Sequence, residues 1–190
     1  MAAEKTSHGG SEWSNDDILR ALSYLREKYH SQVLSGIASE LDNIRPGYLI
    51  VTGFDPENRT HYLNLVDGNR HQLVGRGLNG DTGAVLEKLV AQDEAIVIDQ
   101  SGRIERVGAR LRNYVSAEEL ARALGRGGDG PEWERLGFAT LVGTRHVNAI
   151  LASYVMPGTI VYTLSARTGD IRSYGHGRIM SSTVEGEVCS

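Results

Sequence analysis

Short runs of β-branched and aromatic residues, bounded by glycine and other turn residues, limit the folds open to this chain more than any other feature. These runs lie at residues 48–53, 96–99, 104–111 and 159–165. Their length and composition are typical of strands. Patterns with helical spacing lie before and between them, at residues 16–30 and 85–90 and after Gly143. This alternation predicts a single α/β domain with a central mixed β-sheet flanked by helices.

The composition excludes several classes of protein. A chain of 190 residues with 40% hydrophobic and 23% charged residues is long enough for one core and is typical of a soluble globular domain. Its net charge of -4 gives no broad positive surface for nucleic acid. No apolar run reaches the length of a membrane span, and the single Cys189 cannot form an internal disulfide. We therefore expect a cytoplasmic protein whose partners include neither a membrane nor a nucleic acid.

The expected boundaries follow from changes in composition along the chain. Residues 1–13 are small and polar, which predicts a disordered lead-in. A strand is expected at 62–66, with 71–75 as the other half of a hairpin. Residues 113–142 have the character of an insertion, which we interpret as a lid, a contact surface or a surface loop. The remaining divisions are N-terminal helices at 14–46, with a second helical pattern at 33–41, a main domain at 47–180 and a polar tail at 181–190.

The stretch that begins at Gly143 combines features of an anion site. Gly143 lets the backbone turn, Thr144 is a residue type that caps helices, and Arg145 and His146 follow in the first helical turn. Backbone N–H groups at a helix start favour negative charge, and a guanidinium matches two phosphate oxygens at once. The alternative is an ordinary helix start whose cations face water. The residues alone leave both interpretations open.

A pair of carboxylates stands directly before the predicted strand 96–99. Asp93 and Glu94 would lie at the mouth of a buried strand, where an ionised acid needs a partner. Mg²⁺ or Mn²⁺ would be such a partner, because these ions are held by one or two carboxylates together with phosphate oxygens of a substrate. Carboxylates that simply face water are the alternative interpretation.

The order of these elements and two of the motifs resemble the diadenylate cyclase domain family, which includes the N-terminal domain of the DNA integrity scanning protein. The signatures of the family are Asp-Gly-Ala at the end of a helix and a Gly-Thr-Arg-His-Arg loop. This chain has Asp-Glu-Ala at 93–95 and Gly-Thr-Arg-His-Val at 143–147 in the same order and setting. The resemblance covers roughly Gly47 to Met180, and Gly-Thr-Arg-His in its context is the specific part.

The resemblance implies that the chain binds ATP with Mg²⁺ or Mn²⁺, and that two domains of a homo-oligomer meet face to face. The 3′-hydroxyl of each ATP then attacks the α-phosphorus of the other, which releases pyrophosphate and forms cyclic di-AMP. By matching position, Asp93 would hold the metal and orient the ribose hydroxyl, Glu94 is a possible second metal ligand, and Arg145 and His146 are further catalytic residues. The implied nucleotide-binding residues are Leu111, near adenine, and Gly143, Thr144, Arg145, His146 and Ser165.

Two departures from the family's motifs leave three functions open. Glu94 replaces a glycine, so its side chain could block adenine, repel phosphate or add a metal ligand. Val147 replaces an arginine and removes a charge from the triphosphate site. The first hypothesis is an active cyclase, or a related nucleotidyltransferase with an altered product or base preference. The second is a catalytically silent nucleotide sensor, and the third is a scaffold in which the motif only caps a helix.

Overall fold

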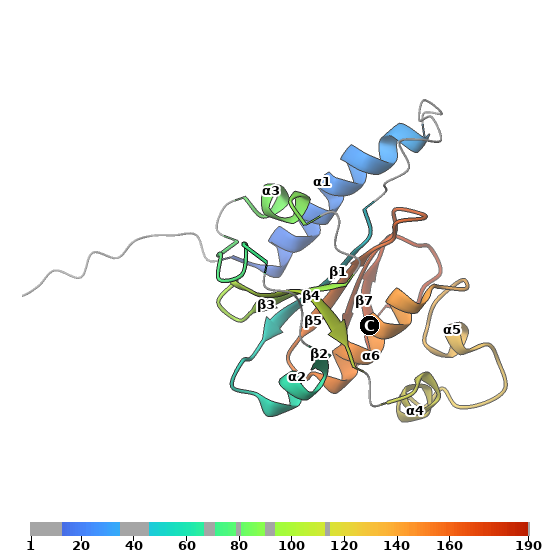
Figure 1. Ribbon diagram of the computed structural model, residues 1–190. Coiled ribbons are helices and arrows are strands. Elements are labelled where there is room, and N and C mark those ends of the chain that lie inside the picture. Colours follow the sequence, from blue (N-terminus) through green and yellow to red (C-terminus); the bar gives the residue numbers. More distant parts are fainter. Residues whose placement is uncertain are drawn as a thin grey trace, which may run out of the picture.

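The computed structural model describes residues 13–34, 46–66, 71–78, 81–89, 94–112 and 115–189. Within these ranges, seven strands form one mixed sheet in the order β2-β4-β3-β1-β5-β6-β7 (Figure 1). The pair β1 and β3 is parallel, and every other neighbouring pair is antiparallel. The strands are β1 (Tyr48–Phe54), β2 (Leu65–Val66), β3 (Ala95–Asp99), β4 (Ile104–Leu111), β5 (Ile160–Leu164), β6 (Ile171–Gly175) and β7 (Arg178–Ser182).

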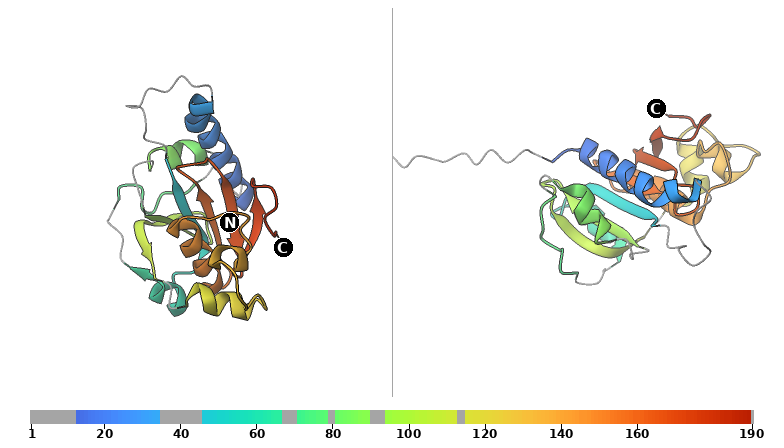
Figure 2. Two further views of the ribbon diagram at one scale, coloured as in Figure 1. Left: turned by 90° about the vertical axis from the view of Figure 1, so that its right-hand side faces the viewer. Right: turned by 90° about the horizontal axis from the view of Figure 1, so that it is seen from above.

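Helices lie on both faces of this sheet (Figure 2). One face is covered by α1 (Asn15–Leu34) and α3 (Thr82–Glu87), and the other by α6 (Thr144–Val155). The shorter helix α4 (Ala117–Ala123) contacts both α6 and α5 (Glu132–Arg135), and α2 (Arg59–Leu63) contacts β2. No helix in the described part of the chain has both the length and the apolar character needed to cross a bilayer. The predicted α/β class, a mixed sheet flanked by helices, is confirmed.

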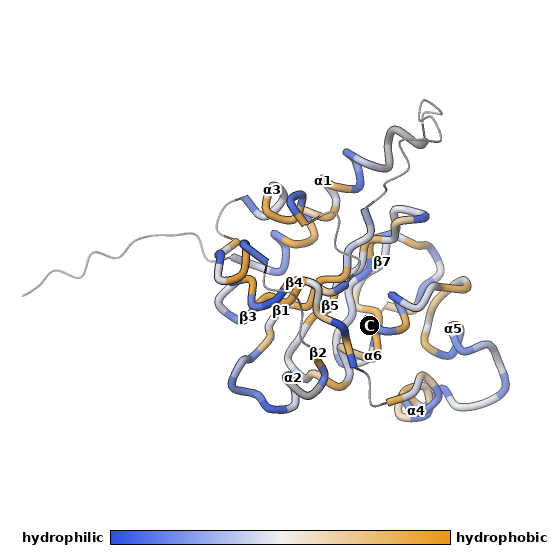
Figure 3. The backbone as a smooth tube through the Cα atoms, viewed as in Figure 1, coloured by the Kyte–Doolittle hydropathy of each residue, from blue (hydrophilic) through white to orange (hydrophobic). Residues whose placement is uncertain are grey.

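The central strand β1 is buried on both faces, and its alternate residues belong to two different cores. Tyr48 and Ile50 pack with α1 and α3, whereas Leu49 and Val51 pack with α6. Successive side chains of a strand point to opposite faces, so a continuous apolar run can fill both cores at once. Figure 3 shows hydrophobic residues along the central strands and in stretches of the helices that cover them.

The predicted hairpin at 62–66 and 71–75 is wrong. Residues Arg59–Leu63 form α2, and only Leu65–Val66 are extended. The side-chain oxygen of Asn58 accepts the backbone N–H of Thr60 at 3.0 Å, and the Asn58 carbonyl accepts that of His61 at 3.0 Å. These local bonds turn the chain into a helix, although its composition favours a strand. Residues 72–75 form turns rather than a strand.

Residues 115–142, the described part of the expected insertion, are packed into the domain. Ser116 and Glu119 form a capping box that starts α4, as the sequence predicts: the Ser116 hydroxyl accepts the backbone N–H of Glu119, and the Glu119 carboxylate accepts the backbone N–H of Ser116. Leu120, Leu136 and Phe138 are at most 2% exposed and belong to the core beneath α6. An idle surface loop is therefore excluded for this segment.

The expected polar tail from residue 181 is also part of the fold. Residues Arg178–Ser182 form β7, which pairs with β6. Further along, the N–H of Val188 donates to the Gly137 carbonyl at 3.2 Å, and Glu187 makes a buried ion pair. Polarity in this segment therefore reflects specific pairing inside the protein. Most of the lead-in at 1–13 and of the helical pattern at 33–41 lies outside the described residues.

Replacing Phe138 with alanine is expected to lower the free energy of unfolding by about 3–5 kcal/mol, because the change leaves a cavity in the core. Urea denaturation measures this difference. Leu141→Ala is the matched control in the same segment: Leu141 is 72% exposed, so the change should stay within about 0.5 kcal/mol. If both substitutions changed the free energy of unfolding by the same small amount, the conclusion that this segment packs into the core would be contradicted.

Candidate functional site

The helix α6 begins with a glycine that the fold itself does not require. Gly143 is the N-cap, with φ of -79° and ψ of 166°, and no side chain caps the helix. A Cβ at this position would have no other atom within 4 Å, so neither backbone conformation nor packing demands glycine. The site is thus an open helix start, where backbone N–H groups and the helix dipole favour an anion.

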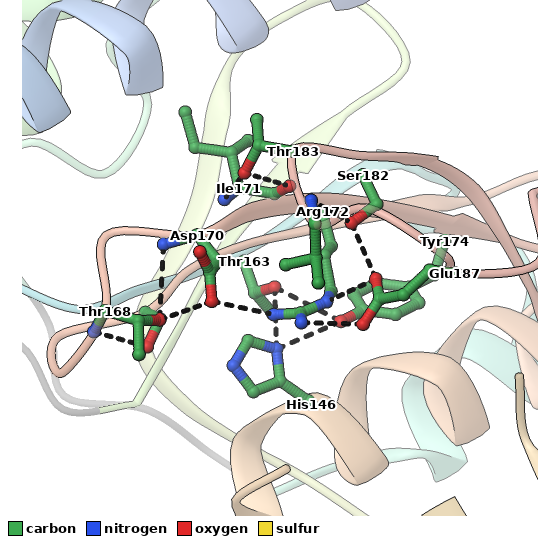
Figure 4. Close-up of polar contacts among 12 residues, drawn as sticks. His146, Thr163, Thr168, Asp170, Ile171, Arg172, Tyr174, Ser182, Thr183 and Glu187 are labelled. Atoms are coloured by element: carbon green, nitrogen blue, oxygen red, sulfur yellow. Dashed lines mark hydrogen bonds and ion pairs between the residues drawn. The ribbon is translucent and has the colours of Figure 1, made fainter. Parts of the chain in front are cut away.

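His146 points from this first turn into the protein (Figure 4). Its Nδ1 lies 3.0 Å from the Thr163 hydroxyl and 3.0 Å from the Tyr174 hydroxyl, and the two hydroxyls are 3.3 Å apart. Burial, together with the charges of Arg172 and Arg145, lowers the pKa of His146 to about 4. The imidazole is therefore neutral near pH 7, and its Nδ1 side serves to anchor α6 to β5 and β6.

Arg145, the preceding residue, packs against the start of β1. A Cβ built on Gly47 would lie 2.0 Å from Nη1 of Arg145 and 3.0 Å from the Cβ of Ala166. The guanidinium therefore occupies space that exists only because residue 47 is glycine. The backbone at Gly47 lies outside the left-handed region, so this requirement comes from the arginine and not from the local turn.

One pocket, which we call the Ser165 pocket, lies between the start of α6 and the turn after β5. Its volume is about 410 Å³. The Ser165 hydroxyl accepts the backbone N–H of Thr168 at 3.2 Å and so closes the turn that forms one wall. The lining contains three arginines and one aspartate and is thus net positive. Its residues are Thr140, Leu141, Val142, Gly143, Arg145, His146, Ser165, Ala166, Arg167, Thr168, Asp170 and Arg172.

A second pocket, the Leu111 pocket, lies on the other side of Arg145 and has a volume of about 380 Å³. Both volumes fall within the range of about 300–1,000 Å³ that is typical of small-molecule sites. Four aliphatic residues and four polar ones line the second pocket. They are Leu49, Ala95, Ala109 and Leu111, with Glu94, Arg110, Arg145 and Asn148. Arg145 is common to both linings, so the two pockets are neighbours.

Glu94 is held by an ion pair inside the Leu111 pocket. Its Oε1 lies 2.5 Å from Nε of Arg110, and the two side chains are 35% and 74% exposed. Among the described residues, no group of three His, Cys, Asp or Glu side chains is placed to hold a metal ion. Of the two expected metal ligands the structure describes only Glu94, which is paired with Arg110, so the Mg²⁺ or Mn²⁺ site stays a prediction. Asp93 lies outside the described residues.

The structure brings most of the predicted nucleotide-binding residues together. Gly143, Arg145, His146 and Ser165 line the first pocket, and Leu111 lines the second with Glu94. Thr144 is exposed and is not among the residues that line either pocket.

The prediction missed two residues, Gly47 and Arg110. Gly47 could be interpreted from the sequence only as the end of a helical pattern. The position of Arg110 in the site follows from the register of the β3–β4 hairpin. Ala95 pairs with Ala109, and this pairing brings Glu94, which precedes Ala95, beside Arg110.

A buried ion pair supports the wall of the Ser165 pocket (Figure 4). Arg172 donates from Nε and Nη2 to the two carboxylate oxygens of Glu187, at 2.8 and 2.7 Å. Both side chains are at most 3% exposed. Burial alone would raise the pKa of Glu187, but hydrogen bonds from Arg172 and Ser182 hold that pKa below its usual range. The backbone N–H of Ala139 also donates to this carboxylate, which ties the loop before α6 to β6.

Comparisons with known proteins bear on the fold alone. No protein-family model matches the chain, and no curated protein matches it. One similar solved structure is a hypothetical membrane spanning protein from Bacillus cereus, with 19% identity and a TM-score of 0.53, over 89% of this chain and 64% of that one. Another is a double mutant of DacA from Staphylococcus aureus, with 15% identity and a TM-score of 0.47, over 90% and 91% of the chains. The chain thus spans somewhat less than two thirds of the Bacillus cereus protein, whose fold it shares.

His146 is expected to make the protein less stable as the pH falls. Its pKa is 6.5 when unperturbed and about 4 in the folded protein, so below pH 6.5 the unfolded chain binds a proton that the folded one does not. The free energy of unfolding should therefore fall by roughly 1.4 kcal/mol per pH unit between about pH 6 and pH 5 from this group alone. Urea denaturation at several pH values measures the slope. In His146→Gln the slope should be smaller by this amount; equal slopes in both proteins would contradict a buried neutral imidazole.

Proposed function

We propose that the two pockets around Arg145 form one nucleotide site, with phosphates in the Ser165 pocket and the base in the Leu111 pocket. The observation that carries this proposal is the position of Arg145, which packs over Gly47 and lines both pockets. A nucleotide has an anionic part and a flat base with polar edges. The Ser165 pocket offers three arginines, and the Leu111 pocket offers four aliphatic side chains with polar groups among them. An arginine at their junction can bind the phosphate nearest to the sugar.

The charges in the Ser165 pocket support its assignment to phosphates. Arg145 and Arg167 contribute guanidinium groups, which form charge-assisted and often bidentate hydrogen bonds with phosphate oxygens. The N-terminus of α6 adds backbone N–H groups to the same wall. The open space at Gly143 leaves room for a ligand to approach that backbone. Arg172 is already neutralised by Glu187 and mainly supports the wall.

The activity that we propose follows the resemblance to the diadenylate cyclase family. Two nucleoside triphosphates, ATP in that family, would be held face to face by two copies of the domain. Each 3′-hydroxyl would attack the α-phosphorus of the opposite nucleotide, so that two pyrophosphates leave and a cyclic dinucleotide forms. Arg145 would neutralise charge on the reacting phosphate, and the pockets would supply positioning. Mg²⁺ or Mn²⁺ would arrive with the triphosphate, and Asp93 remains the proposed residue that receives it.

A second candidate is a silent sensor that binds the nucleotide without turnover. Two observations favour it. Val147 packs against the core under α6, so no cation from this position reaches the phosphates. Glu94 places a carboxylate, paired with Arg110, where the family's glycine leaves space for the nucleotide. Both candidates need the same binding site and differ only in whether a product forms.

A single set of incubations separates these functions. The protein is mixed with each ribonucleoside triphosphate and Mg²⁺ or Mn²⁺, the products are separated by chromatography, and thermal shift reports binding. A cyclic product that is lost in Asp93→Asn would establish the cyclase. Stabilisation by nucleotide without a product would establish the sensor. If the protein shows neither a product nor stabilisation by nucleotide, the scaffold hypothesis remains.

Arg145→Met is expected to weaken nucleotide binding by about 10- to 100-fold, because the variant keeps most of the apolar stem but loses a charge-assisted contact with phosphate. Isothermal titration calorimetry measures the affinity. Arg178→Met is the matched control, since Arg178 is an exposed residue of β7 and is not part of either lining. Equal affinities of the two variants would contradict the assignment of the site.

Gly47→Ala tests the position of Arg145 without removing it. The added methyl group would overlap Nη1 of Arg145, which must move away. The severe overlap is with the end of a flexible side chain, and the approach of 3.0 Å to the Cβ of Ala166 requires only a small shift, so we expect a change in unfolding free energy of about 1 kcal/mol. Nucleotide affinity should nevertheless fall about tenfold, the equivalent of one misplaced hydrogen bond to a charged group. An unchanged affinity would show that the space at residue 47 has no role in binding.

A further inference from the structure

We propose that the Leu111 pocket selects guanine over adenine, and that Glu94 and Arg110 are the residues that make the distinction. This inference rests on the proposed nucleotide site and adds the identity of the base. It starts from the four polar residues that line the pocket, Glu94, Arg110, Arg145 and Asn148. Arg145 is assigned to the phosphates, and the amide of Asn148 both donates and accepts, so it can meet either purine. Leu49, Ala95 and Leu111 offer contact to any base, so they carry no discrimination.

Glu94 distinguishes the two purines through its charge. An ionised carboxylate only accepts hydrogen bonds, and its two oxygens can accept from two neighbouring donors. Guanine presents two such donors side by side, the ring N1–H and the exocyclic N2 amino group. Adenine has an unprotonated N1 on that edge, whose lone pair would face a carboxylate oxygen, and only its N6 amino group can donate. Glu94 therefore attracts guanine with two hydrogen bonds and repels part of the adenine edge.

Arg110 favours the same base from the adjoining edge. A guanidinium only donates hydrogen bonds, and guanine offers it two acceptors, O6 and N7, in an arrangement that arginine recognises bidentately. In adenine an amino group takes the place of O6, so a hydrogen-bond donor of the base would face the guanidinium of Arg110, which is also a donor. The order of groups around guanine is N2, N1, O6 and N7, so its donor edge and its acceptor edge are neighbours. Glu94 and Arg110 are likewise in direct contact, one acceptor beside one donor.

The ion pair between these residues does not prevent base binding. Its side chains are 35% and 74% exposed, and a pair so open to water and salt adds little stability. A base that satisfies both groups can separate them at small cost. Adenine would have to separate the same pair without satisfying either group fully, and unpaired polar groups at a site are the usual basis of strong discrimination.

Calorimetric titration with GTP and ATP, each with Mg²⁺, tests the inference on the wild-type protein, Glu94→Gln and Glu57→Gln. We expect GTP to bind the wild type about tenfold more tightly than ATP, the discrimination typical of one well-placed bidentate contact. In Glu94→Gln this ratio should fall to about threefold or less, because an amide offers both a donor and an acceptor. Glu57 is exposed in the turn after β1 and lines neither pocket, so its substitution should leave the ratio unchanged.

Two results would overturn the inference while the proposed site stands: ATP binding as tightly as GTP or more tightly, and a preference for GTP that survives in Glu94→Gln. Absence of binding by both nucleotides would overturn the proposed nucleotide site itself and this inference with it. Inosine triphosphate adds an internal check, because it lacks the N2 amino group. It should bind the wild type more weakly than GTP does, whereas Glu94→Gln should bind the two nucleotides equally.

Discussion

The buried imidazole of His146 holds the first turn of α6 in place, and both pockets depend on that turn. On an α-helix, neighbouring residues point in directions about 100° apart. Because His146 is fixed inward by the hydroxyls of Thr163 and Tyr174, the adjacent Arg145 is directed outward to the junction of the pockets. The histidine of the motif thus has a structural role that the sequence pattern does not reveal, and the half-buried arginine provides the cation that lines both pockets.

A second buried interaction makes this arrangement rigid. The ion pair between Arg172 and Glu187 joins β6 to the last described turn of the chain, and the Ala139 N–H brings in the loop before α6. Phe138, in the same loop, packs edge-on against His146 and Tyr174, with ring centroids 6.4 and 6.2 Å away. Removing one partner of a buried ion pair is costly, since it leaves a charge without compensation. The two stretches that wall the Ser165 pocket, residues 140–146 and 165–172, are therefore connected through Glu187, which comes from a third part of the sequence.

The sequence was most informative where local chemistry and burial agree. The strand at 104–111 and the capping box at Ser116 follow from periodicity and from a short motif, and the structure has both. It was misleading at α2, where Asn58 redirects a strand-like composition, and after residue 181, where polar side chains are paired inside the fold. The contact of Arg145 with Gly47 links residues almost a hundred positions apart, and no local pattern predicts it. By contrast, the pairing of Glu94 with Arg110 could have been predicted from hairpin register.

The central claim is that a nucleotide spans the two pockets with Arg145 at the junction. A crystal structure of the protein with a non-hydrolysable nucleoside triphosphate tests it most directly. We expect a phosphate oxygen at hydrogen-bonding distance from the Arg145 guanidinium, about 2.7–3.2 Å, with the remaining phosphates toward Ser165 and the base between Leu111 and Glu94. A nucleotide bound away from Arg145, with both pockets filled only by water, would contradict the claim.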